Sequence, residues 1–147
     1  MRPDYGLGNH VAPLGLAYAE RSAMPERFQE GMFVGLHGSW NRRPRAGYAV
    51  VFVPFEQGRP KGMPIDVLGG FVDDDGNAQG RPVGVAFDAR GALLVADDVG
   101  NVVWRVDAAP GAAAGATAAR AAPRLVPGRA PGGARGGVAS AVFDRRR

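Results

Sequence analysis

The stretch APLGLAY at residues 12–18 recurs as RPVGVAF at residues 81–87, with the same order of proline, glycine, apolar residue, alanine and aromatic ring. Each copy is followed by a second and a third apolar run rich in Val, Leu or Phe, and Gly, Asn and Asp separate these runs. This pattern is typical of β-strands joined by turns. Because the unit is used twice, at a size close to a blade of about 40 to 50 residues, we predict a β-propeller architecture.

The predicted fold class is all-β, because the sequence has no long stretch of helical periodicity. Turns are expected at residues 88–91 and 98–101, where Asp, Gly and Asn gather. The predicted strands are Val11–Ala19, Met32–His37, Tyr48–Phe55, Pro82–Asp88, Ala92–Ala96 and Val102–Val106.

The predicted strands make about two blades, whereas closed propellers have typically 4 to 8. An open pair of blades leaves sheet edges and inter-blade faces uncovered. We therefore expect a propeller fragment whose partners include missing blades, with Met1 as a secondary start of a longer protein.

The composition divides the chain into a propeller part, residues 1–107, and a tail, residues 108–147. The tail is almost wholly Ala, Gly, Pro and Arg, and is predicted to be disordered. It holds seven arginines and one aspartate and therefore has a net charge of +6. Because the net charge of the whole chain is +4, the propeller part has a net charge of −2. Since the excess of positive charge lies outside the predicted fold, we expect no nucleic-acid partner.

The chain has no cysteine, which excludes disulfides and thiolate metal sites. No run is apolar enough to span a bilayer, and residues 1–6 do not resemble a signal peptide. The acidic run Asp73-Asp74-Asp75 lacks the ligand spacing of an EF-hand and is interpreted as a solvated turn. We therefore predict no metal site within this chain and no insertion into a membrane.

Six motifs in order resemble the glucose/sorbosone dehydrogenase family, the soluble quinoprotein sugar dehydrogenases. They are PDYGLGNHVAPLGL at 3–16, HGSWNR at 37–42, GYAVVFVPF at 47–55, GRPVGVAFD at 80–88, GALLVADD at 91–98 and GNVVWRV at 100–106. The resemblance covers nearly all of residues 3–107 and none of the tail.

The resemblance implies a fragment of a six-bladed propeller that uses pyrroloquinoline quinone and calcium to oxidise an aldose or a related sugar aldehyde. It also implies export to the periplasm or the medium. In this family a histidine base removes the substrate hydroxyl proton while hydride passes to the quinone. The blades that carry this base and the calcium ligands are absent here, so we assign no catalytic residue.

Arg81 opens a predicted strand where the channel face of a propeller begins, and its guanidinium could fork onto a carboxylate of the quinone. The alternative is a structural pair with Asp97, which follows another strand. The resemblance implies that Asp97 faces the same channel, where we expect it to orient Arg81. Both interpretations can hold in one network.

Three further residues are candidates for the cofactor site. His10, in a Gly-rich turn, is either a contact to cofactor or substrate or a histidine that caps backbone groups. His37 and Arg42 flank Trp40 in a compact cluster that could supply an aromatic wall and a charge, although we expect Trp40 to pack within a blade.

We therefore predict part of a quinone-dependent sugar dehydrogenase, inactive alone, that contributes to the cofactor wall through Arg81, Asp97, His10, His37 and Arg42. The alternative is a non-catalytic propeller segment that serves in binding or assembly, since a fold does not guarantee a function.

Overall fold

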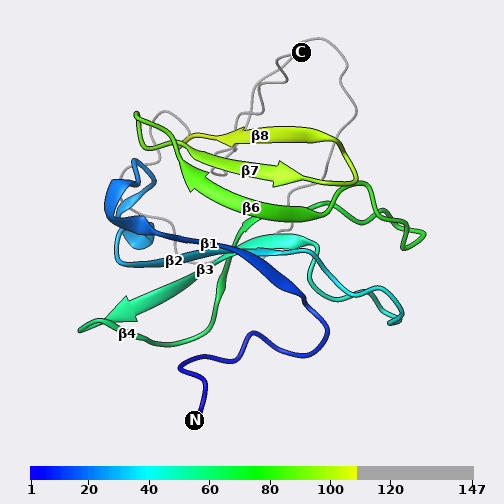
Figure 1. Cartoon of the computed structure of the whole chain (residues 1–147), viewed down its shortest axis with the longest axis horizontal. Coiled ribbons are helices and arrows are strands. Elements are labelled where there is room, and N and C mark those ends of the chain that lie inside the picture. Colours follow the sequence, from blue (N-terminus) through cyan, green and yellow to red (C-terminus); the bar gives the residue numbers. More distant parts are fainter. Residues whose placement is uncertain (109–147) are drawn as a thin grey trace, which may run out of the picture.

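The computed structural model describes residues 1–108, which form two antiparallel β-sheets (Figure 1). The first sheet has the order β1-β2-β3-β4, and β5 also pairs with β3. Its strands are β1 Pro13–Tyr18, β2 Gly31–Leu36, β3 Ala49–Glu56, β4 Arg59–Pro60 and β5 Ile65–Leu68. The predicted tail, apart from Ala108, lies outside the described residues.

The second sheet has the order β6-β7-β8, with strands β6 Pro82–Phe87, β7 Leu93–Asp97 and β8 Val102–Val106. Two short 3-10 helices, η1 Ala19–Arg21 and η2 Glu26–Phe28, connect β1 to β2. The prediction of an all-β fold is thus confirmed. Figure 1 shows the second sheet stacked over the first, with β6 nearest to it.

The main core lies between the two sheets, because alternate side chains of each sheet point toward the other. Phe33 and Phe52 of the first sheet are fully buried, with ring centroids 4.9 Å apart. Phe87 of the second sheet meets Phe33 edge to face at 5.3 Å. Leu93, Val95 and Val106 complete the apolar contact from the second sheet.

The backbones of β1 and β6 approach very closely at Gly15. A Cβ atom on Gly15 would lie 2.1 Å from the Val83 carbonyl oxygen, so no side chain fits there. Gly84, the equivalent glycine of the second copy, has only the Ala96 Cβ nearby, at 3.9 Å. The first glycine therefore lies within the interface between the sheets, and its repeat equivalent lies on the face turned away from it.

The first sheet has a second apolar face, turned away from the core. Val34, Leu36, Val51 and Val53 are buried beneath it. Leu16 pairs with Val34 and Tyr18 with Met32, so these two side chains lie on the same face, and Leu16 is 63% exposed. The repeat equivalents Val85 and Phe87 instead pack into the main core.

Six of the eight strands agree with the predicted ones to within one or two residues. The first strand begins at Pro13 rather than Val11, because Ala12 has φ of +47°, and the third begins after Tyr48, which has φ of +60°. The short strands β4 and β5 were not predicted, since Pro60, Gly62 and Pro64 disrupt the alternation there. Both predicted turns are present.

Candidate functional site

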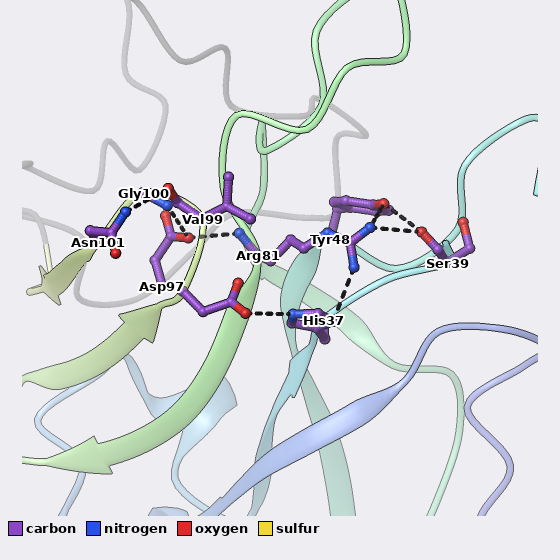
Figure 2. Close-up of polar contacts among 9 residues, drawn as sticks. His37, Ser39, Tyr48, Arg81, Asp97, Val99, Gly100 and Asn101 are labelled. Carbon is purple, nitrogen blue, oxygen red and sulfur yellow. Dashed lines mark hydrogen bonds and ion pairs between the residues drawn. The ribbon is translucent and has the colours of Figure 1, made fainter. Parts of the chain in front are cut away.

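Arg81 directly precedes β6 and extends its side chain to the first sheet (Figure 2). Its Nη2 donates to the Tyr48 hydroxyl at 2.6 Å and to the Ser39 carbonyl at 3.2 Å, and its Nη1 lies 3.2 Å from the His37 Nδ1. The guanidinium also lies over the Tyr48 ring, 4.9 Å from its centroid. Arg81 thus links the start of β6 to the end of β2 and the start of β3.

His37 continues this chain of contacts toward solvent. Its Nδ1 accepts from Arg81, which leaves Nε2 as the donor to the Asp98 carboxylate at 3.2 Å. The neighbouring Arg81 therefore assigns the tautomer of the imidazole. We call His37, Ser39, Tyr48, Arg81 and Asp98 the inter-sheet polar cluster. Its members come from one end of both sheets, where β2 and β7 finish and β3 and β6 begin.

The backbone around Tyr48 makes this arrangement possible. The Tyr48 ring is buried against Gly38, where a Cβ atom would lie 2.2 Å from a ring carbon, and Gly38 has φ of +94°. The Tyr48 hydroxyl donates to the Ser39 carbonyl and accepts from Arg81. Glycine at position 38 therefore allows the phenol to reach the guanidinium.

Asp97, the last residue of β7, is only 3% exposed and lies beside the cluster. Its carboxylate accepts from the backbone amides of Arg81 and Gly100, at 2.7 and 2.9 Å, and from the Trp104 indole at 3.0 Å. The predicted side-chain pair of Asp97 with Arg81 is not the contact that forms, because the carboxylate bonds to the Arg81 amide and not to the guanidinium. Asp97 thus positions Arg81 through its main chain.

Within residues 1–108, no hydrogen bond joins His10 or Arg42 to the inter-sheet polar cluster. They line an open concavity of about 750 Å³ together with Asn9, Trp40, Asn41 and Arg43. The Arg42 Nη1 donates to the Asn9 carbonyl at 3.0 Å, which ties the segment before β1 to the loop between β2 and β3. Of the five predicted site residues, the structure therefore brings Arg81 and His37 into direct contact, with Asp97 behind them.

Trp40 does not pack within a blade as the sequence suggested, because its side chain is 86% exposed. Sequence reasoning also missed Tyr48, Ser39 and Asp98 as members of the cluster. Tyr48 was placed inside a strand, and only its position after Gly47 pointed to a special backbone. Asp98 is adjacent to Asp97 in a predicted turn, and the family resemblance pointed to Asp97 alone.

Within residues 1–108, no group of three or more His, Cys, Asp or Glu side chains is placed to hold a metal ion. Among the same residues, neither short helix has the length and apolarity that a membrane span needs. The cluster is thus a cationic hydrogen-bonding site, in which a half-buried guanidinium is held by neutral partners.

Comparison with known proteins gives the chain a family. Residues 1–109 match the family described as TrAA12-like. A pyrroloquinoline quinone-dependent pyranose dehydrogenase of Coprinopsis cinerea is 39% identical over 54 residues, 37% of this chain and 7% of that protein. An uncharacterized protein of Borreliella burgdorferi is 34% identical over 103 residues, 69% of this chain and 27% of that protein.

The fold has a counterpart among solved structures. The iodide structure of the Trichoderma reesei Carbohydrate-Active Enzymes Family AA12 protein superposes with a TM-score of 0.51 and 26% sequence identity, over 64% of this chain and 24% of that one. A calcium structure of the same protein gives a TM-score of 0.51 with 25% identity. The chain therefore spans about a quarter of the length of these relatives.

These findings support the coarser part of the resemblance, a sugar dehydrogenase that depends on pyrroloquinoline quinone, but not the glucose/sorbosone family in particular. The two stacked sheets correspond to a fragment of such a propeller-like domain. Because the matching family covers residues 1–109, well over half of the chain, this protein belongs to the TrAA12-like family.

Proposed function

We propose that this chain forms part of the cofactor wall of a sugar dehydrogenase that depends on pyrroloquinoline quinone. The observation that carries the proposal is the guanidinium of Arg81, which is held at the junction of the two sheets by His37, Ser39 and Tyr48. The Coprinopsis cinerea relative, which is named for this cofactor, supports the choice of ligand.

The residues present fit a cofactor that carries carboxylates. Of the five N–H groups of the Arg81 guanidinium, three have acceptors within residues 1–108, which leaves two for a ligand. Charge-assisted bonds from arginine to a carboxylate are about twice as strong as neutral ones. Tyr48 and the Asp97 contact to the Arg81 amide fix this arginine before a ligand arrives. Preorganisation of this kind lowers the cost of binding.

The bound quinone supplies the acceptor for the hydride that leaves the sugar. This chain's own residues bind and orient, and the proposal assigns the proton-abstracting base to another part of a longer protein. The resemblance implies calcium, but residues 1–108 contain no cluster of metal-ligating side chains that fits this ion. We therefore assign calcium no role at the residues of this chain. His10 and Arg42 remain proposed contacts to cofactor or substrate on the concavity.

The proposal includes export to the periplasm or the medium, which rests on the resemblance to exported sugar dehydrogenases.

The cofactor proposal is tested by titrating the 147-residue protein with pyrroloquinoline quinone, with and without calcium, while absorbance and melting temperature are followed together. A ligand that binds the folded state must raise the melting temperature. We expect a saturable rise that is lost in Arg81→Ala and partly kept in Arg81→Lys. Arg59→Ala is the matched control, since Arg59 is exposed on β4.

An Arg81→Ala protein that is folded, as judged by its melting without ligand, and that still binds the quinone like the wild type contradicts the assignment. His37→Gln gives a second test, because it removes the imidazole acceptor for Arg81 and leaves the guanidinium in place. We expect it to weaken the response less than Arg81→Ala.

A second candidate function, a segment for assembly with further blades, is favoured by the outer face of the first sheet. Leu16 is exposed there beside Tyr18, whereas the repeat equivalents Val85 and Phe87 are packed against the first sheet. If the same kind of contact is used again, the outer face of the first sheet would pack against the face of another blade that carries small residues such as Gly84. We propose a neighbouring blade of this repeat as its partner.

The assembly proposal predicts that the isolated chain associates through this face. Sedimentation velocity should show oligomers for the wild type and a monomer for Leu16→Ser combined with Tyr18→Ser. Val99→Ser, at an exposed position in the turn between β7 and β8, is the control for loss of an apolar side chain elsewhere. A wild type that remains monomeric at high concentration and binds no apolar dye would contradict the proposal.

A further inference from the structure

Trp40, in the loop between β2 and β3, exposes 86% of its side chain. A single exposed apolar residue is common on protein surfaces and by itself indicates nothing. Tryptophan is different in kind, because its large rigid ring gains much from being covered and its N–H still needs a polar partner. The surroundings of the ring decide what could cover it.

The main chain beneath Trp40 is held in place from both sides. The Ser39 amide donates to the Ala46 carbonyl at 2.7 Å, and the Ala46 amide donates back to the Ser39 hydroxyl at 3.1 Å. Arg45 donates to the Trp40 carbonyl at 2.8 Å and, through Nε, to the Gly76 carbonyl at 3.1 Å. The exposed indole therefore projects from a loop whose main chain is cross-linked, so the loop loses little main-chain freedom when a ligand contacts the ring.

Polar side chains surround the ring. Among the described residues 1–108, Trp40 is the one apolar residue that lines the concavity; the others are Asn9, His10, Asn41, Arg42 and Arg43. Asparagine amides supply both donors and acceptors, and guanidinium groups supply donors in fixed directions. The Arg42 contact to the Asn9 carbonyl, at 3.0 Å, joins the two segments that form the walls. This is one aromatic surface within a rim of hydrogen-bonding groups.

We propose that Trp40 is a platform on which a pyranose ring stacks, with the polar side chains of the concavity bonded to the sugar hydroxyls. A pyranose has a face of C–H groups and a rim of hydroxyls, which is the complement of this surface. An apolar ligand would need an enclosed apolar pocket, whereas this concavity is open and five of its six described lining residues have polar side chains.

The platform lies next to the inter-sheet polar cluster. The Ser39 carbonyl accepts from Arg81, and Trp40 is the following residue. A sugar on Trp40 would thus lie at the same end of the sheets as the proposed quinone contacts. The inference rests on the proposed function for the choice of a sugar as ligand, and the geometry of the surface stands independently of it.

Tryptophan fluorescence of the intact 147-residue protein, without quinone, tests the platform. The chain has two tryptophans, and Trp104 is partly buried against Phe71, so Trp40 is the one that a surface ligand covers. Methyl β-D-glucopyranoside should shift the emission in a saturable way and protect Trp40 from quenching by iodide. Sorbitol, which has hydroxyls and no ring face, should do neither at the same concentration.

Trp40→Ala should remove the sugar response and raise the dissociation constant, measured by calorimetry, at least tenfold, while Trp40→Phe keeps part of the affinity. Because the side chain is exposed, both variants should melt like the wild type, and Trp104 emission reports that the fold is kept. Equal sugar affinity in Trp40→Ala, or an equal response to sorbitol, would overturn the inference.

A parallel quinone titration separates this inference from the cofactor proposal. We expect Trp40→Ala to bind pyrroloquinoline quinone like the wild type and Arg81→Ala to keep the sugar response. If Trp40→Ala instead loses quinone binding and the wild type does not respond to the sugar, Trp40 stacks on the cofactor and the pyranose platform is wrong. A sugar response without any quinone binding would contradict the cofactor proposal and would leave the pyranose platform supported.

Discussion

At the scale of single residues, Asp97 organises more of the structure than its place at the end of a strand suggests. One carboxylate receives an amide from the start of β6, an amide from the following turn and the indole N–H of β8. All three donors lose water when the sheets form, so the carboxylate replaces several hydrogen bonds at once. Its effect on Arg81 is exerted through the backbone, and Asp97 is thus a positioning residue.

Replacement of Asp97 by alanine should lower the free energy of unfolding by about 3 kcal/mol or more, because each buried donor left without an acceptor costs roughly 1 to 3 kcal/mol. Asp97→Asn keeps one carbonyl oxygen and should lose less. Urea unfolding followed by fluorescence measures both. Asp98→Ala is the matched control, since the Asp98 side chain is largely exposed and, within residues 1–108, its one hydrogen bond is to the His37 ring. Equal losses in the two alanine variants would contradict this account.

Motif order and strand ends were enough to select Arg81, His37 and Asp97, whereas their mutual contacts were not predictable. A sequence shows that an arginine and an aspartate flank two strands, but it does not show whether the carboxylate meets a guanidinium or an amide. That choice depends on the turn at residues 98–101, which directs the Gly100 amide inward. The same limit applies to Trp40, because apolarity predicts burial and the cross-linked loop holds the ring outside.

At the scale of elements, the closest contact between the sheets is that of β1 with β6. The strands themselves followed from alternation and turn residues, and β4 and β5 escaped notice because their stretches are short and contain proline. Repetition of a sequence unit predicted the two sheets, but the side on which each copy meets the other emerged only from the structure. The paired glycines Gly15 and Gly84 give a direct test of that side.

Gly15→Ala should lower stability by about 1 to 3 kcal/mol or more, since the new methyl group would lie 2.1 Å from the Val83 carbonyl oxygen and the sheets must shift to admit it. Gly84→Ala is the matched control, because its nearest neighbour would be 3.9 Å away, at an ordinary contact distance. Thermal unfolding of both proteins compares them. A Gly84→Ala protein as destabilised as Gly15→Ala would show that backbone preference, and not the interface, sets the effect.

The turn between β6 and β7 should make stability depend on acid pH. Burial of the Asp88 carboxyl acts to raise its pKa, but hydrogen bonds from Arg105 and from the Arg90 and Ala92 amides outweigh it and hold the pKa below the ordinary 3.8. The same hydrogen bond raises the pKa of Arg105, because the Asp88 carboxylate stabilises the charged guanidinium.

Because the folded pKa of Asp88 is depressed, its stabilising contribution is present above pH 3.8 and is lost as the pH falls through the folded value. The pKa of Asp73 is lowered as well, mainly by the Asn77 amide, so its contribution is also lost as the pH falls. Unfolding curves at a series of pH values should therefore show stability falling below about pH 4. Asp88→Asn should flatten this fall, with Asp73→Asn as the comparison, and an unchanged slope in Asp88→Asn would count against the assignment.

At the scale of the whole molecule, the two sheets share one apolar core. Phe33 and Phe52 belong to the first sheet, and Leu93 and Val95 to the second, yet they form a single cluster. The prediction of two adjacent blades described this correctly, and the number of further blades is a property of longer relatives. Only about a quarter of such a relative corresponds to this chain.

A shared core predicts that the sheets unfold together. Trp104 fluorescence reports the second sheet, and far-ultraviolet circular dichroism reports both, so their urea transitions should coincide in the wild type. Gly15→Ala, which separates β1 from β6, should pull the two transitions apart. Transitions that already differ in the wild type would show that the sheets are independent folding units.

The sheets contact each other through unlike faces: the large side chains of β6 and its neighbours press on the side of β1 where Gly15 leaves room. A contact between two different faces is heterologous, so the sheets are arranged head to tail. Each sheet that is added covers one exposed face and leaves an identical face exposed on its other side, so addition through this contact does not end with a pair of sheets. It stops only when the row bends back on its first member, and otherwise it grows into a filament.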